Sequence, residues 1–252
     1  MFMRLVHTKI NPEKFQDFRK FYDKKVIAEL QKTPGCLCAG LMQSEQYRDE
    51  CISMTLWEQQ QHAEAYEESG LFQKLLAQAR PYLADSSEWK MQLSKDYTLE
   101  YQPVEEEPVV KSFTVVEQKN SDVCDREKSQ FMYMRIVSLR LEPGKLQEFR
   151  QLYREEIIRA LCAVKGCRYA YLTESLKDEN EVISVTIWDS KKDAENYERS
   201  GLFDKLREKV KHTFSELYQW KMTLEKEFGK KLATSEDMKV NYYSIITGKK
   251  FQ

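Results

Sequence analysis

The stretch Ile52–Trp57 reads ISMTLW, and the stretch Ile183–Trp188, which begins 131 residues later, reads ISVTIW. A longer match keeps this offset: AEAYEESGLFQKL at Ala63–Leu75 corresponds to AENYERSGLFDKL at Ala194–Leu206. Internal similarity at one constant offset is typical of repeated units. Two long copies indicate a tandem duplication of one domain rather than a solenoid, which is built from shorter and more numerous repeats.

Each copy is predicted to form strand, helix, two strands, helix and strand. Apolar residues three and four positions apart indicate the helices, and β-prone runs between turn residues indicate the strands. In the first copy we expect strands Met1–Ile10, Cys36–Ser44, Cys51–Trp57 and Trp89–Leu93, a helix from Asn11 to the Pro34-Gly35 stop, and a helix Glu58–Leu83 interrupted near Ser69-Gly70. The second copy repeats this order as far as Leu224. The order is that of the ferredoxin-like βαββαβ unit, so the predicted fold class is α+β.

The third strand of each copy suggests how the copies meet. Side chains alternate between the two faces of a strand. The alternation separates an aliphatic set from a Ser/Thr/Trp set: Ile52, Met54 and Leu56 against Ser53, Thr55 and Trp57. We expect the aliphatic face to pack under the helices and the other face to lie against the second copy. This predicts an intramolecular pseudo-dimeric α+β barrel with a cavity between the two sheets.

The duplication also predicts the domain organisation. Repeat 1 spans residues 1–95, a linker spans 96–131, repeat 2 spans 132–226, and a C-terminal tail spans 227–252. The linker combines an acidic patch with a strand-like run at Ser112–Val116. A β-prone stretch in the tail, Val240–Thr247, is expected to add an edge strand or to cap the cavity.

Composition and charge narrow the function classes. The 252 residues include 40 Lys and Arg against 41 Asp and Glu, a balance without the basic footprint of nucleic-acid binding. We expect no membrane partner, because no apolar run reaches the roughly 20 residues of a spanning helix. The N-terminal stretch has no export-signal pattern, which favours a cytoplasmic protein with its six cysteines as reduced thiols. No His/Cys cluster has metal-ligand spacing, so no metal is expected.

Several of these features together resemble the antibiotic biosynthesis monooxygenase (ABM) family of the dimeric α+β-barrel superfamily. The matching features are the Pro-x-Lys turns at Pro12–Lys14 and Pro143–Lys145, the Trp that ends the third strand, and the helix carrying Ala63–Tyr66 and Ser69–Phe72. The resemblance covers both repeats. It implies a cofactor-free monooxygenase acting on an aromatic polyketide or, in another branch of the family, a haem-degrading enzyme.

The resemblance implies site residues in the polyketide-oxidising branch. Trp57 and Trp188 match the strand-three Trp that positions an aromatic substrate, so they are candidate catalytic residues. The Asn of that branch is replaced by Ser53 or Ser184, which are carried as substrate-binding candidates.

The haem-degrading branch is matched less well. The Asn of that branch falls on Val6 or Val137 here, its Trp on Tyr66 or Tyr197, and its His on Leu76 or Arg207. Haem degradation by that mechanism is therefore not expected, and no cofactor is predicted.

Further candidates come from the residues themselves. Arg4 and Arg135 lie on the first strand between apolar neighbours, where a guanidinium can bind an anionic or carbonyl oxygen. The alternative is an ion pair that holds the two sheets together. Tyr66 and Tyr197 are either helix anchors or hydrogen-bond donors to a ligand.

The two copies differ in the helix that follows. Arg207 in the second copy replaces Leu76 and could stabilise a developing oxyanion, which makes the second copy the expected active half. The alternative is that Arg207 belongs to a solvated helix face.

Two functions follow from these observations. The first is a cofactor-independent monooxygenase that oxidises a small aromatic or quinol-like substrate in a cavity between sheet and helices. The alternative is a non-catalytic or stress-related protein that binds a small hydrophobic ligand there. In both, the partner is a small hydrophobic or aromatic molecule, and the pseudo-dimer leaves further oligomerisation open.

Overall fold

The structure is a computed structural model that describes residues 1–93, 99–105, 109–119, 132–176, 178–215 and 238–251; within these ranges, the side chains of most residues between 85 and 119, and of 238 and 239, are not described. The chain divides into two compact units. One contains Met1–Met3 and Ser112–Ile245, and the other contains Arg4–Lys111 and the C-terminal residues from Ile246. They correspond in the main to the second and the first repeat, and each is described by itself.

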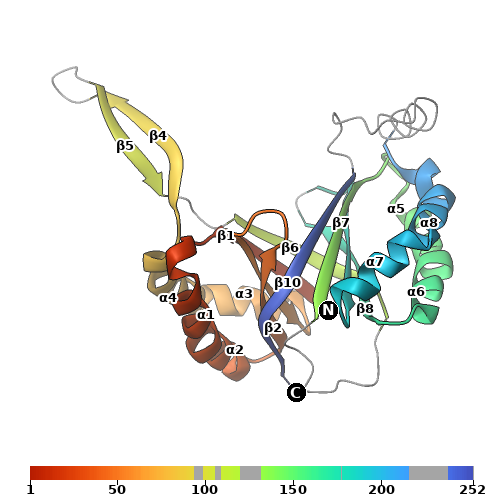
Figure 1. The fold of residues 1–252 in the computed structure, drawn as a ribbon, viewed down its shortest axis with the longest axis horizontal. Helices are drawn as coiled ribbons and strands as arrows, with labels where there is room; N and C mark the ends of the chain where they lie inside the picture. The colour runs from red at the N-terminus through yellow and green to blue at the C-terminus, as the bar shows by residue number, and fades with distance from the viewer. Residues whose placement is uncertain (94–98, 106–108, 120–131, 177, 216–237, 252) are drawn as a thin grey trace. The chain divides into compact units, whose positions relative to one another are not determined.

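The two repeats have the same order of elements, which confirms the predicted duplication of an α+β unit (Figure 1). The first contains β1 (Phe2–Lys9), η1 (Pro12–Lys14), α1 (Phe15–Phe21), η2 (Tyr22–Val26), α2 (Ile27–Lys32), β2 (Cys36–Ser44), β3 (Glu50–Trp57), α3 (Gln60–Glu68), α4 (Leu71–Ala79) and η3 (Arg80–Tyr82). The second contains β7 (Tyr133–Arg140), α5 (Leu146–Leu152), η5 (Tyr153–Ile158), α6 (Arg159–Ala163), β8 (Cys167–Ser175), β9 (Glu181–Trp188), α7 (Lys191–Arg199), α8 (Leu202–Val210) and η6 (Lys211–Thr213).

Helix boundaries fall where glycine supplies a left-handed backbone. Gly35 ends the first helical segment with a φ of 75°, and Gly70 and Gly201 separate the two halves of the second with φ of 73° and 72°. Positive φ has little steric penalty at glycine, because there is no Cβ. In both repeats the first helix also contains a π-helical turn, η2 or η5, which begins at Tyr22 or Tyr153. Such turns are rare and often occur at functional sites.

The sheet of the second repeat has the order β10-β7-β9-β8-β6, with β6 (Val109–Lys119) and β10 (Met238–Lys250) at its edges. Strand β10 pairs antiparallel with β7, with Val240 opposite Val137. It occupies the place beside the first strand that a ferredoxin-like unit gives to its own last strand. The β-prone C-terminal stretch therefore forms a strand, and the predicted strand near Trp220 lies outside the described residues.

The sheet of the first repeat has the order β1-β3-β2, with the end of β10 beside β2. Here one prediction is wrong. The expected last strand forms within β4 (Asp85–Leu93), but it pairs with β5 (Leu99–Glu105) in a separate two-stranded sheet. A hairpin between neighbouring strands closes a short loop and therefore loses less chain entropy than a return to the main sheet. The predicted linker 96–131 thus contains the whole of β5 and of β6.

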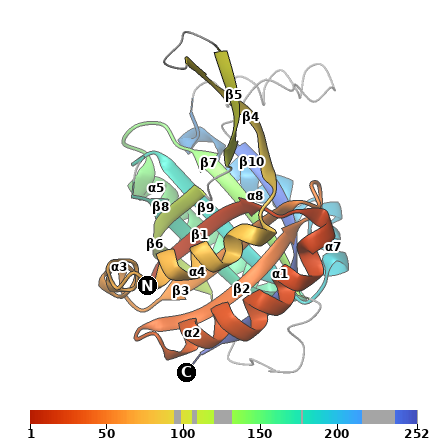
Figure 2. The same cartoon turned by 90° about the vertical axis from the view of Figure 1, so that its left-hand side faces the viewer.

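The helices of each repeat cover one face of its own sheet; Figure 2 shows α1, α2 and α4 over β1, β2 and β3. The predicted assignment of the faces is wrong. Ser53 and Thr55 face the helices, where Tyr22 hydrogen-bonds Ser53, and the aliphatic set Ile52, Met54 and Leu56 is buried on the opposite face. The helices carry large aromatic rings, which fill the space above small hydroxyl side chains. Packing of the two repeats against each other stays a prediction.

Candidate functional site

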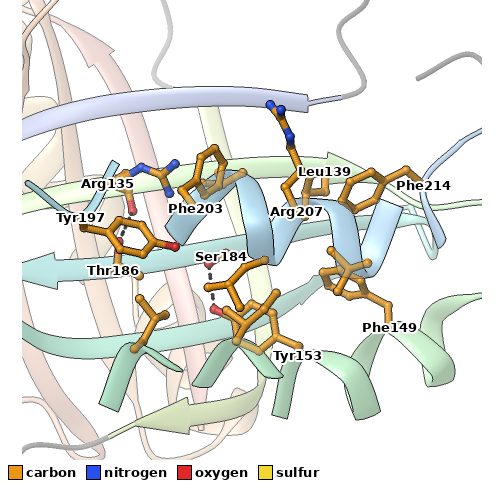
Figure 3. Close-up of a pocket in the computed structure, with 15 residues that line it drawn as sticks. Arg135, Leu139, Phe149, Tyr153, Ser184, Thr186, Tyr197, Phe203, Arg207 and Phe214 are labelled. Carbon is orange, nitrogen blue, oxygen red and sulfur yellow. Dashed lines mark hydrogen bonds between the residues drawn. The ribbon is translucent and has the colours of Figure 1, made fainter. Parts of the chain in front are cut away.

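Each repeat contains a pocket between its sheet and its own helices. The cavity of the second repeat is about 40 Å³ and that of the first about 80 Å³; with the open space at their mouths, about 460 Å³ and 650 Å³ are free of protein atoms. Figure 3 shows the second pocket, with Arg135 and Tyr197 toward one end and Phe149 and Phe214 toward the other. The pocket is therefore polar at one end and aromatic at the other.

Arg135 supplies the positive charge of the second pocket. Its side chain is 3% exposed, its Nε donates to Glu198 Oε1 at 2.7 Å, and its Cζ lies 4.1 Å from the ring centroid of Phe203. Its Nη2 is buried and has no hydrogen-bond partner within the described part of the chain. A buried guanidinium N–H without a partner is costly, and a ligand oxygen would satisfy it.

Arg4 has the matching position in the first pocket and forms an ion pair with Glu67. Glu67 lies on α3, as Glu198 lies on α7. These arginines therefore form ion pairs, as the alternative expected. The pairs do not join two sheets, however, because each joins a sheet to a helix of the same repeat.

Tyr197 points its hydroxyl into the pocket (Figure 3). Burial raises the pKa of Tyr197 to about 12, although the nearby Arg135 charge acts to lower it. None of the residues drawn in Figure 3 forms a hydrogen bond with this hydroxyl. The matching Tyr66 is also buried, and burial raises its pKa to about 12, opposed by Arg4. Both tyrosines are thus neutral hydroxyls that can donate a hydrogen bond to a ligand.

A second hydroxyl pair lies in the middle of each pocket. Tyr153 and Ser184 join their oxygens at 2.8 Å, and Tyr22 and Ser53 do so at 2.7 Å. Burial raises the pKa of Tyr153 well above its usual range. Sequence reasoning missed both helix tyrosines as site residues, although Tyr22 and Tyr153 share the repeat offset, which was the available signal.

The two candidate tryptophans lie beneath the pocket wall. Trp57 and Trp188 are 0% exposed, and each indole N–H donates at 2.9 Å to the Thr two residues earlier. The ring centroid of Trp188 is 5.1 Å from that of Tyr197, and Trp57 lies 5.2 Å from Tyr66. With their N–H groups already paired, the tryptophans are placed to support the tyrosines rather than to contact a substrate.

Arg207 also lines the second pocket, and its Cζ lies 5.9 Å from the ring centroid of Phe203. Its Nη2 pairs with Asp204 at 3.1 Å on the same helix, and its guanidinium points away from Ser184 and Tyr153 (Figure 3). In the first repeat, Leu76 lines the pocket at the matching position. The Arg207 side chain is 28% exposed, and its Nε is buried without a hydrogen-bond partner among the described residues. Its role as a catalytic residue stays a prediction.

The described residues offer a pocket rather than a metal centre. Within 1–93, 132–176 and the other described ranges, no three His, Cys, Asp or Glu side chains are grouped to hold a metal ion. In the same ranges, none of the helices has the length and apolar character that crossing a membrane requires. The first pocket has one arginine and the second has two, and each adds several hydroxyls and apolar walls. Such a lining can bind a phenolic or carbonyl oxygen and shield it from water.

Known structures share this architecture. A candidate monooxygenase from Fusobacterium nucleatum matches with a TM-score of 0.69 at 8% identity, covering 99% of this chain and 94% of the other. One from Lactobacillus acidophilus matches with a TM-score of 0.66 at 7% identity, covering 99% and 95%. An anthrone oxidase-like protein matches with a TM-score of 0.57 at 12% identity, covering 99% and 92%. At these identities the likeness concerns the fold alone. No curated protein matches the sequence.

The fold and its pockets define a protein of two ferredoxin-like repeats, each with a pocket under its helices. The family model for antibiotic biosynthesis monooxygenase matches residues 1–78 and 132–209, one match in each repeat. The chain belongs to this family, as a tandem-repeat member.

Proposed function

We propose that the protein is a cofactor-independent monooxygenase that oxidises a small, electron-rich aromatic or quinol-like substrate in the pocket of the second repeat. The observation that carries the proposal is the buried Arg135. Its Nη2 has no hydrogen-bond partner among the described residues, and its Cζ lies 5.9 Å from the ring centroid of Tyr197 in the same apolar pocket. Family membership and the resemblance in fold to an anthrone oxidase-like protein support the same reaction class.

The reaction needs no external electrons. An activated methylene of an anthrone-type substrate reacts with O₂ to give a carbonyl and water, so that O₂ accepts the four electrons that the carbon loses. The substrate supplies the carbanion once it loses a proton to solvent. Arg135 and Tyr197 would hydrogen-bond the substrate oxygen on which the negative charge develops, and a charge-assisted bond in a water-poor pocket is strong.

The remaining residues orient these two groups. Glu198 accepts from Arg135 Nε and also from the Tyr242 hydroxyl at 2.6 Å, which fixes the direction of the guanidinium. Trp188 packs against the ring of Tyr197. The aromatic end of the pocket, with Phe149 and Phe214, would hold the hydrophobic part of the substrate.

Oxygen uptake with an anthrone and hydroquinone panel tests the proposal. We expect consumption of about one O₂ per anthrone oxidised, and a loss of at least about 100-fold in kcat/KM for Arg135→Gln, the scale on which removal of one oxyanion donor acts. The matched variant Arg4→Gln, in the first repeat, should retain the activity.

Two results would contradict the proposal. One is binding of the aromatic panel without oxygen uptake, which would favour the non-catalytic binding function. The other is an equal loss of activity in Arg4→Gln and Arg135→Gln, because the second pocket would then have no special role.

A further inference from the structure

The pocket of the first repeat is larger and less polar than its counterpart. Two residues on its wall are smaller than their counterparts in the second repeat: Ala79 corresponds to Val210, and Leu83 to Phe214. Leu76 also replaces Arg207, so that Arg4 is the one charged residue among the described side chains that line this pocket. The two pockets therefore present different surfaces to a ligand.

Arg4 is deeply buried in this apolar wall. Its side chain is 3% exposed, its Cζ lies 4.1 Å from the centroid of Phe72 and 5.7 Å from that of Tyr66, and both rings line the pocket. Its buried Nε has no hydrogen-bond partner in the described ranges. An ionised group in such a place requires a counter-charge and acceptors for its N–H groups.

Glu67 supplies that counter-charge from the solvent side of the pair. Its side chain is 46% exposed, against 29% for Glu198 in the second repeat. Glu198 is also held by the Tyr242 hydroxyl, whereas Arg4 is the one ion-pair partner of Glu67 among the described side chains. Leaving Arg4 without a partner would be costly, but a ligand carboxylate that replaces Glu67 keeps the guanidinium paired while Glu67 returns to water.

The electrostatic balance around Arg4 points the same way. Burial lowers the pKa of Arg4, and the attraction of Glu67 does not fully offset this effect. The guanidinium is therefore short of negative charge, and a second anion beside it would stabilise its charged form.

We propose that the first repeat binds an aromatic monocarboxylate, whose carboxylate takes the place of Glu67 on Arg4 while its rings occupy the apolar pocket. The site is separate from the proposed oxidation and does not depend on it. A monoanion fits because a single guanidinium lines the pocket, so that a dianion would leave one charge buried and uncompensated. A neutral ligand would leave Arg4 Nε poorly satisfied, and a cation would be repelled.

Calorimetric titration with 2-naphthoate and its neutral analogue 2-naphthamide, at neutral pH and low salt, tests this site. We expect one naphthoate per chain, bound at least about tenfold more tightly than the amide, because hydrogen bonds to an ionised acceptor are about twice as strong as neutral ones. Arg4→Gln should remove this preference. The matched variant Arg135→Gln should retain it.

Two further variants keep the test decisive if Arg4→Gln does not fold. Glu67→Gln removes the competing carboxylate and should tighten naphthoate binding several-fold. Leu83→Phe copies the residue of the second repeat and should weaken binding of both ligands by filling the pocket. Equal binding of naphthoate and naphthamide, a preference lost in Arg135→Gln, or weaker naphthoate binding in Glu67→Gln would each overturn the proposal. Naphthoate is not an oxidisable phenol, so these results are independent of oxygen uptake.

Discussion

Removing the hydroxyl of Tyr153 tests the buried tyrosine–serine pair that lies in each pocket. In Tyr153→Phe the ring remains, but Ser184 loses the hydroxyl 2.8 Å away while staying 8% exposed. A buried polar group left without its partner destabilises a protein by about 1–3 kcal/mol. We expect a loss of that size in the free energy of unfolding.

The matching pair in the first repeat allows the two tyrosine variants to be compared, because the structure predicts which of them loses more stability. There Tyr22 joins Ser53 at 2.7 Å and also donates to the carbonyl oxygen of Gly40 at 3.1 Å. Tyr22→Phe therefore removes an additional buried hydrogen bond, and its loss of stability should exceed that of Tyr153→Phe by about 1 kcal/mol. The ranking follows from the hydrogen bonds and not from ring size, since both variants keep the ring.

Urea unfolding followed by tryptophan fluorescence measures both variants, and a double-mutant cycle isolates the pair. Ser184→Ala in the Tyr153→Phe background removes the orphaned hydroxyl, so the double variant should be more stable than the sum of the single losses predicts, with a coupling of about 1 kcal/mol. Coupling below about 0.3 kcal/mol, or a Tyr22→Phe variant less affected than Tyr153→Phe, would refute this reasoning.

Three other outcomes are expected. Burial raises the pKa of Tyr66 and Tyr197 to about 12, so the unfolded chain releases these protons at a lower pH than the folded protein does. The free energy of unfolding should therefore fall as pH rises above about 10. Tyr66→Phe should make this fall less steep, as measured by unfolding at several alkaline pH values. Trp188→Phe should lower the free energy of unfolding by about 1–3 kcal/mol, because it removes the indole N–H bond to Thr186 and leaves a void; a thermal midpoint equal to wild type would contradict its placement in the core. Gly201→Ala should lower the free energy of unfolding by about 1–2 kcal/mol through backbone strain alone, since a Cβ there would meet no atom within 4 Å. An unchanged midpoint in urea unfolding would show that the positive φ is not required.

The duplication, the order of elements and several boundaries could be read from the sequence. A constant offset identifies the repeat without reference to packing, and Gly35 marks a helix end through its own backbone preference. Strand alternation likewise placed Arg4 and Arg135 on the same face as Val6 and Val137, and all four line the pockets. These are properties of local chain geometry, which sequence spacing encodes directly.

Tertiary structure alone decided which face of the sheet the helices cover and which partner each polar group finds. Alternation divides the residues of β3 between two faces of the strand. It does not show that the face of Ser53 lies under Tyr22, because this contact depends on how an aromatic side chain packs from a helix 31 positions away in the sequence. The pairing of Arg135 with Glu198, 63 positions apart, is equally invisible in spacing. Contacts between residues distant in sequence are selected by packing and burial in three dimensions, and these determine which side chains remain free to bind a ligand.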